Sequence, residues 1–334
     1  MPTNLPGVSP TADEQERGPH AVTYPYRRIE RVPVTPAEGP DPYGNPDARP
    51  AWMDVDWGEH VHRAQLGEQV VNYAEIGDGP PVVFVHGLGG CWQNWLENMP
   101  RMAELGHRAI ALDLPGFGSS PMPADGVSIP GYAKVVNDLC AHLGVEECTL
   151  VGNSMGGFTA AAVAVDEPTW VHRLVLVSAA GISHASMRRE PVEVAARMTV
   201  AANPILLRLD MPSMKRPGLR KMAFGGIVSH PLKLRPELLI EQITNGFAAP
   251  AVVPAAVALT GYDLLDRLER INVPTLIVWG SDDLVVPASD AAGYAERIAG
   301  SELVVFDDCG HVPMLERPVR FNRILAEFVG SGGA

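Results

Sequence analysis

Three residues that lie far apart in the sequence are of the types that together activate a hydroxyl group. Ser154 stands in "GNSMGG", between Gly152 and Gly156, and Asp283 and His311 follow further along the chain. A serine hydroxyl is a weak nucleophile at neutral pH and needs a base beside it. An imidazole base in turn needs an acceptor on its other nitrogen. A serine, an aspartate and a histidine in this chain order predict nucleophilic attack on a carbonyl group.

The glycines around Ser154 indicate a sharp turn from a strand into a helix. Side chains at Gly152 and Gly156 would collide in such a turn, so glycine at both positions lets the serine hydroxyl project. A helix beginning at Met155 would present its positive dipole end at the same place, which favours an anion there. The bare G-x-S-x-G pattern also occurs in ordinary turns, so its meaning depends on the rest of the chain.

Six short apolar runs alternate with helical patterns and predict a mostly parallel sheet. Runs of valine, isoleucine and leucine without polar alternation are typical of strands buried on both faces. The runs begin at residues 81, 108, 148, 173, 274 and 302, and a hairpin around Gly67 precedes them. Functional groups of parallel sheets gather at the carboxyl ends of the strands. Four of the predicted ends are followed by chemically suggestive residues: His86 and Gly87, Ser154, Asp282 and Asp283, and His311.

Composition divides the chain into three parts. The first 50 residues hold 11 of the 31 prolines, which predicts a Pro-rich N-terminal extension over residues 1–57. Within it, residues 26–34 alternate and could pair as an edge strand. Residues 58–181 and 263–334 carry the strand pattern. Residues 182–262 contain only helix-like segments, which predicts a helical cap. This segment also holds ten Lys or Arg against five Asp or Glu, which favours a solvated surface over a site for an acidic substrate.

The totals argue against several classes of partner. A formal net charge of −13 disfavours nucleic acid and anionic membranes. No run of 18 apolar residues predicts a membrane span, and the N-terminus lacks the features of a signal peptide. Four scattered cysteines without C-x-x-C spacing favour a cytoplasmic protein. No metal or phosphate-loop motif occurs, so we expect no cofactor and a small-molecule substrate. The N-terminal extension could also form a homodimer.

The sequence resembles the α/β-hydrolase family over residues 60 to 330. The matching pieces are "HGLGG", "DLPGFGSS", "GNSMGG", "WGSDDLVVP" and "GHVPMLERP". The resemblance implies an α/β-hydrolase fold, with a mostly parallel sheet of about eight strands, helices on both faces and a helical cap. It also implies that Ser154 is the nucleophile and His311 the general base. The place where some members carry the acid reads "VSAAG", and G-x-x-D counted from Gly280 reaches Asp283 rather than Asp282, so Asp283 is the implied acid.

The resemblance also implies how the oxyanion of a tetrahedral intermediate is held. The backbone N–H groups of Leu88 and Met155 would bind it, and Gly152 and Gly156 would shape the serine turn. His86 would have a loop-shaping role rather than a proton-transfer role, and the adjacent Gly87 belongs to the same loop.

The expected reaction is hydrolysis of a carboxylic ester, thioester or lactone of a small to medium apolar substrate, through an acyl-enzyme on Ser154. Activity should rise with pH as the imidazole loses its proton. "GNSMGG" also resembles the serine turn of meta-cleavage-product hydrolases, which cleave carbon–carbon bonds of vinylogous diketo acids, although "HGLGG" lacks their "GPG" stretch. A cofactor-free haloperoxidase-like or perhydrolase activity and a non-catalytic ligand-binding role are further alternatives.

Overall fold

A sheet of eight strands runs through the part of the chain that the structure describes. This computed structural model describes residues 32–166, 169–184, 187–206, 211–245 and 249–330. The strand order is β1-β2-β4-β3-β5-β6-β7-β8. The strands are β1 (Val61–Leu66), β2 (Gln69–Ile76), β3 (Pro81–Val85), β4 (Arg108–Leu112), β5 (Cys148–Asn153), β6 (Val171–Val177), β7 (Thr275–Gly280) and β8 (Glu302–Phe306).

The sheet is mostly parallel, as the sequence predicts. β1 and β2 form the antiparallel hairpin around Gly67, and β2 also pairs antiparallel with β4. Every other pairing, from β4 across to β8, is parallel. Each of the six apolar runs coincides with one strand, although β6 begins two residues before its run, and all residues of β5 and β7 are buried. The continuous apolar runs therefore identified strands that are covered on both faces.

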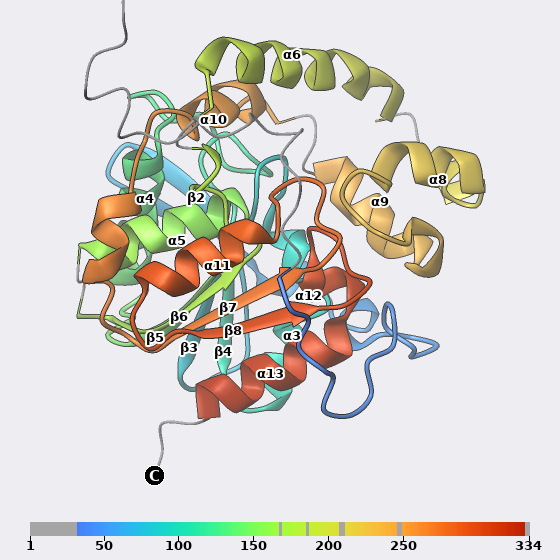
Figure 1. Cartoon of the computed structure of the whole chain (residues 1–334), viewed down its shortest axis with the longest axis horizontal. Coiled ribbons are helices and arrows are strands. Elements are labelled where there is room, and N and C mark those ends of the chain that lie inside the picture. The colour runs from blue at the N-terminus through green and yellow to red at the C-terminus, as the bar shows by residue number, and fades with distance from the viewer. Residues whose placement is uncertain (1–31, 167–168, 185–186, 207–210, 246–248, 331–334) are drawn as a thin grey trace, which may run out of the picture.

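Helices cover both faces of this sheet. On one face lie α4 (Ile129–His142), α5 (Met155–Val165) and α11 (Ser289–Arg297). On the other lie α3 (Met99–Glu104) and α13 (Pro318–Gly330), as Figure 1 shows. Each face has its own buried apolar cluster. Shorter helices join these elements: η1 (Ala51–Met53), α2 (Trp57–His60), η2 (Trp92–Trp95), η5 (Leu265–Arg270) and α12 (Pro313–Glu316).

Between β6 and β7 the described residues form helices and no strand, as predicted for residues 182–262. α6 packs against α10 and lies above the rest of the insertion in Figure 1. Met198 of α6 and Met222 of α8 are mostly exposed, so these two methionines do not line an interior pocket. The helices are α6 (Arg189–Leu206), α7 (Met211–Met214), α8 (Pro217–Phe224), η4 (Pro231–Lys233), α9 (Pro236–Asn245) and α10 (Val252–Ala258).

Residues 32–57, which we call the arm, are the described part of the N-terminal extension. The arm passes over β8 and lies beside α12 and α13 (Figure 1). Thr35 N–H donates to the Val305 carbonyl at 2.8 Å, and Val305 N–H donates to Thr35 Oγ1 at 3.0 Å. Residues 26–31 of the possible edge strand lie outside the described residues, and residues 32–34 form no strand. Thr35 nevertheless satisfies backbone groups on the free edge of β8.

Candidate active site

Ser154 occupies the turn between β5 and α5 in a strained backbone conformation. Its φ is 55° and its ψ is −118°, which L-residues rarely adopt. A Cβ atom added at Gly152 would lie 2.3 Å from the Gly156 carbonyl oxygen. A Cβ atom added at Gly156 would lie 2.2 Å from the Val85 carbonyl oxygen. Both distances are far below van der Waals contact, so the turn that projects Ser154 requires glycine at both positions.

Backbone and amide hydrogen bonds hold this turn against the neighbouring strand. Ser154 N–H donates to the Val177 carbonyl at 2.9 Å, and Ala180 N–H donates to the Ser154 carbonyl at 3.0 Å. The Asn153 amide donates to the Val177 carbonyl at 3.1 Å and to the His311 carbonyl at 3.3 Å. The residue before Ser154 thus bridges the end of β6 and the loop that carries His311.

Asp283 and His311 form a buried hydrogen-bonded pair. His311 Nδ1 lies 2.8 Å from Asp283 Oδ2, and the two residues are 5% and 3% exposed. Asp283 Oδ1 accepts from the backbone N–H groups of Val285 and Val286 at 2.8 and 2.9 Å. Because an ionised carboxylate only accepts hydrogen bonds, the proton of the neutral ring is on Nδ1. The lone pair of Nε2 is then available to take a proton from another group.

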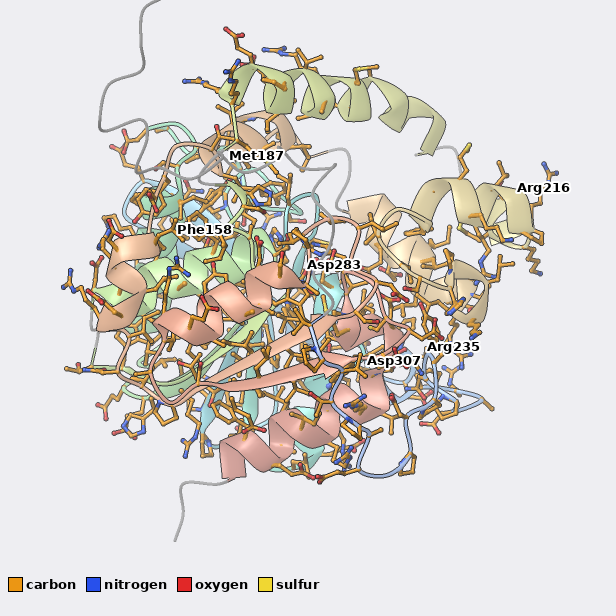
Figure 2. All side chains as sticks on the ribbon, viewed as in Figure 1. Phe158, Met187, Arg216, Arg235, Asp283 and Asp307 are labelled. Carbon is orange, nitrogen blue, oxygen red and sulfur yellow. The ribbon has the colours of Figure 1, made fainter. Side chains whose placement is uncertain are left out.

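The other aspartates near these residues in the sequence do not pair with His311. Asp282 and Asp307 are exposed, and Figure 2 labels Asp307 apart from Asp283. Asp308 pairs with His230, at 2.5 Å. Among the residues that the structure describes, His311 therefore has Asp283 as its carboxylate partner.

Ser154 lies at the same end of the sheet as this pair. Among the described residues, the Ser154 hydroxyl makes no direct hydrogen bond to His311. The Ser154 turn is instead joined to the His311 loop by the hydrogen bond from the Asn153 amide to the His311 carbonyl. Nucleophile–base contacts are often long without substrate and tighten when substrate binds. The arrangement therefore has the three groups of an activated serine in neighbouring positions.

Two backbone N–H groups near Ser154 have no acceptor within the described part of the chain. Met155 N–H belongs to the first turn of α5, where N–H groups have no partner within the helix. Leu88 N–H follows Gly87, where an added Cβ atom would lie 3.1 Å from Ser154 Cβ. The loop after β3 therefore approaches the serine closely.

His86 connects the loops that follow β3 and β4. Its Nδ1 donates to the Gly87 carbonyl at 2.7 Å, and its Nε2 accepts from Leu114 N–H at 3.0 Å. Complete burial lowers its pKa to about 4, so the ring is neutral at physiological pH. Both ring nitrogens make hydrogen bonds, so neither is free for proton transfer. His86 is therefore a structural part of the loop.

A second histidine near the pair was not predicted from the sequence. Burial and, to a smaller extent, the nearby charge of His311 lower the pKa of His184 to about 4, although Asp283 acts in the opposite direction. The Nδ1 atom of His184 is buried and has no hydrogen-bond partner among the residues that the structure describes. His184 follows the end of β6 in "VSAAGISH". That strand end was a usable signal for a functional side chain, but the burial of the ring beside His311 depends on the folded chain.

Other kinds of site are not found among the residues with a described position. No group of three or more His, Cys, Asp or Glu residues in residues 32–330, the gaps noted above excepted, could hold a metal ion. No helix in the described ranges is long and apolar enough to cross a membrane. All four cysteines are buried and free.

Residues 82–324 match the sequence model of the alpha/beta hydrolase family. The match covers more than half of the chain, and the eight-stranded sheet agrees with it. This protein belongs to the alpha/beta hydrolase family, which confirms the family and the fold predicted from the sequence.

Similar proteins include two named hydrolases and an esterase. A 2-hydroxy-6-oxo-6-phenylhexa-2,4-dienoate hydrolase of Comamonas testosteroni is 29% identical, over 80% of this chain and 94% of that protein. A 2-hydroxy-6-oxononadienedioate/2-hydroxy-6-oxononatrienedioate hydrolase of Pseudomonas sp. is 30% identical, over 83% of this chain and 95% of that protein. The solved structure of the esterase EaEST from Exiguobacterium antarcticum is 27% identical with a TM-score of 0.65, over 78% of this chain and 96% of that one.

Proposed function

We propose that this protein is a serine hydrolase that cleaves a carboxylic ester through an acyl-enzyme on Ser154. The observation that carries the proposal is the buried Asp283–His311 pair at the end of the sheet where the strained Ser154 turn projects a hydroxyl. The pair provides a base with a fixed tautomer, and the turn provides a nucleophile. These are the parts that acyl transfer needs.

In the proposed reaction, His311 Nε2 takes the Ser154 proton as Oγ attacks the substrate carbonyl. The tetrahedral intermediate collapses, the alcohol leaves with the proton from His311, and the acyl group stays on Ser154. Water then attacks with His311 again as base, and the carboxylic acid is released. Asp283 stabilises the imidazolium that forms in both steps, and its two backbone donors keep it in place.

The N–H groups of Leu88 and Met155 are the proposed oxyanion donors. Their lack of partners within the described chain supports this role, because a preorganised donor spends no energy on breaking an earlier bond. Each such donor contributes about 3 to 4 kcal/mol to transition-state stabilisation in other hydrolases. The N-terminal end of α5 adds a favourable dipole at the same point.

Hydrolysis of a carbon–carbon bond is the second candidate function. This candidate is favoured by the similarity of the chain to the phenylhexadienoate hydrolase of Comamonas testosteroni and the nonadienedioate hydrolase of Pseudomonas sp. Each match extends over most of this chain. The same serine, histidine and aspartate would act, and the leaving group would be a conjugated carbon instead of an alcohol. A perhydrolase-like reaction would also use these residues. The helices of residues 182–262 are the proposed cap over a small-molecule substrate in each case.

The test is a series of p-nitrophenyl esters of increasing acyl length, with Ser154→Ala as the comparison. We expect turnover by the unaltered protein and a loss of several orders of magnitude in kcat for the variant, with unchanged folding. 2-Hydroxy-6-oxo-6-phenylhexa-2,4-dienoate is assayed in parallel. Turnover of the dienoate alone would select the carbon–carbon reaction. No Ser154-dependent turnover of either class would leave a non-catalytic binding role.

A further inference from the structure

The backbone on both sides of His311 is held by one buried carboxylate. Glu316 is completely buried, and its Oε2 accepts from Gly310 N–H at 3.0 Å. Its Oε1 accepts from Val312 N–H at 3.3 Å. His311 N–H itself donates to the Ile227 carbonyl at 2.8 Å. The loop position of His311 therefore depends on where the Glu316 carboxylate is held.

Tyr43 of the arm holds that carboxylate from the other side. Its hydroxyl donates to Glu316 Oε2 at 2.5 Å and accepts from His230 N–H at 2.7 Å. The next residue, Gly44, donates its N–H to the Glu316 carbonyl at 2.6 Å. Ser229 N–H adds a donor to Glu316 Oε2 at 2.9 Å. The arm and the segment around residue 229 thus meet on the carboxylate that fixes the His311 loop.

The environment of Tyr43 keeps its hydroxyl protonated and its ring in place. Burial and the charge of Glu316 raise the pKa of Tyr43 well above its ordinary value, so the hydroxyl stays a donor. The Arg317 guanidinium lies 4.9 Å and the Lys233 ammonium 5.2 Å from the ring centroid, and the His230 ring packs edge-on at 5.1 Å. These contacts use the ring alone, so removal of the hydroxyl leaves them intact.

We propose that Tyr43 is a positioning residue, through which the arm holds the Glu316 carboxylate and hence the His311 loop in the geometry that activates Ser154. The inference rests on the proposed function, because it assigns His311 as the base. It goes beyond the family resemblance, because the arm precedes the matched residues 82–324. Tyr43 therefore belongs to the N-terminal extension of this chain, whereas the site that it supports lies in the part of the fold that the family shares.

The arm does not need the Tyr43 hydroxyl to stay attached. The Asn45 amide donates to Glu97 Oε2 at 2.7 Å, and Trp52 Nε1 donates to Glu97 Oε1 at 3.0 Å. Arg320 donates to Asp41 Oδ2 at 3.2 Å, and Thr35 bonds to β8. Loss of the Tyr43 hydroxyl should therefore leave the arm in place and change the position of the His311 loop. Asn45 also provides a matched control, because its side chain likewise donates a hydrogen bond to a buried carboxylate, that of Glu97.

The experiment compares Tyr43→Phe with Asn45→Ala in the full chain. Ser154 is labelled with a fluorophosphonate probe. In the labelling reaction, the serine oxygen displaces fluoride from phosphorus and His311 takes the serine proton. We expect labelling to slow roughly 10-fold in Tyr43→Phe, since small misplacements of a catalytic group cost up to about 100-fold. We expect Asn45→Ala to label within about two-fold of the unaltered protein. On any ester that is turned over, kcat should fall and KM should stay the same in Tyr43→Phe.

A second readout follows His311 directly. The downfield NMR signal of the His311 Nδ1 proton, assigned by its loss in His311→Gln, should move or broaden in Tyr43→Phe and stay unchanged in Asn45→Ala. Thermal midpoints should fall by similar amounts in the two variants. Equal labelling rates together with an unchanged signal in Tyr43→Phe would overturn the inference and leave the proposed function intact. Absence of labelling in the unaltered protein would overturn the proposed function, and the NMR comparison would then still decide whether Tyr43 positions the ring.

Discussion

The Asn153 amide donates a hydrogen bond to the backbone carbonyl of His311, 158 positions further along the chain, at 3.3 Å. The same amide donates to the Val177 carbonyl at 3.1 Å. Asn153 ends β5 and directly precedes Ser154, so one side chain sets the distance between the serine turn and the histidine loop. This bond joins the two elements that carry Ser154 and His311.

Replacement of Asn153 by alanine should lower kcat with little change in KM. Removal of the amide frees the His311 loop relative to the Ser154 turn, and a misplacement of about 1 Å costs up to roughly 100-fold in rate. The measurement is steady-state kinetics on the best ester substrate, with urea unfolding as the check on stability. A kcat equal to that of the unaltered protein would show that Glu316 and Ile227 position the loop without Asn153.

Asp283→Asn should be far more damaging than Asp282→Asn. The asparagine amide would place a donor where His311 Nδ1 needs an acceptor, so the ring would present the wrong tautomer to Ser154. The corresponding change in other serine hydrolases costs about 10⁴-fold in kcat. Asp282 is exposed, and the hydrogen bond of His311 Nδ1 goes to Asp283, so the Asp282 variant should retain activity within about two-fold.

The measurement is kcat for both variants at a pH above the region where imidazole titrates. The two substitutions differ by one position and change the net charge equally, so a general electrostatic effect would reduce both rates alike. Equal losses in the two variants would therefore argue against Asp283 as the specific partner of His311.

The strands and the serine turn could be predicted because their signals are local. A continuous apolar run predicts a strand buried on both faces, and β5 and β7 are buried throughout. The glycines around Ser154 are explained by contacts within a few residues of the turn and with the neighbouring strand end. Carboxyl ends of parallel strands meet at one edge of the sheet, so the proximity of Asp283 to His311 also followed from topology.

The contacts of the arm could not be predicted from the sequence, because they depend on side chains that meet only in the folded chain. Tyr43 lies 273 positions before Glu316, and no periodic pattern connects the two. The proline-rich composition of the extension does not indicate which residues of the fold the arm contacts. His184 was missed for a related reason, since its burial beside His311 follows from the packing of the chain after β6.

Acidification should reveal two histidines that stay neutral in the folded protein. Burial lowers the pKa of His86 and of His184 to about 4, whereas histidine in an unfolded chain titrates near 6.5. A lowered folded-state pKa means that the unfolded state binds protons first. The stability associated with each neutral ring is complete above a pH of about 6.5 and is lost as the pH falls towards 4. For the fully buried His86 ring the loss is on the order of 3 kcal/mol.

NMR of the histidine ring nitrogens against pH measures these two midpoints directly. Raised carboxyl pKa values act on stability in the opposite direction, since burial raises the pKa of Glu97, Asp113 and Glu316. A bulk stability curve would therefore mix both contributions, and the ring titrations separate them. Midpoints near 6.5 for either ring would show that it is hydrated or paired in solution.

Gly152→Ala should destabilise the fold because its added methyl group meets the backbone. The new Cβ atom would lie 2.3 Å from the Gly156 carbonyl oxygen and 2.7 Å from Gly157 Cα. Backbone at both contacts cannot move aside without a shift between β5 and α5, so we expect a loss of at least about 2 kcal/mol in the free energy of unfolding. Urea unfolding measures this loss. Gly218→Ala in α8 is the control, because an added Cβ atom there meets nothing within 4 Å and alanine favours the helix. The control should be neutral or stabilising, and equal stability of the two variants would mean that the turn around Ser154 relaxes freely.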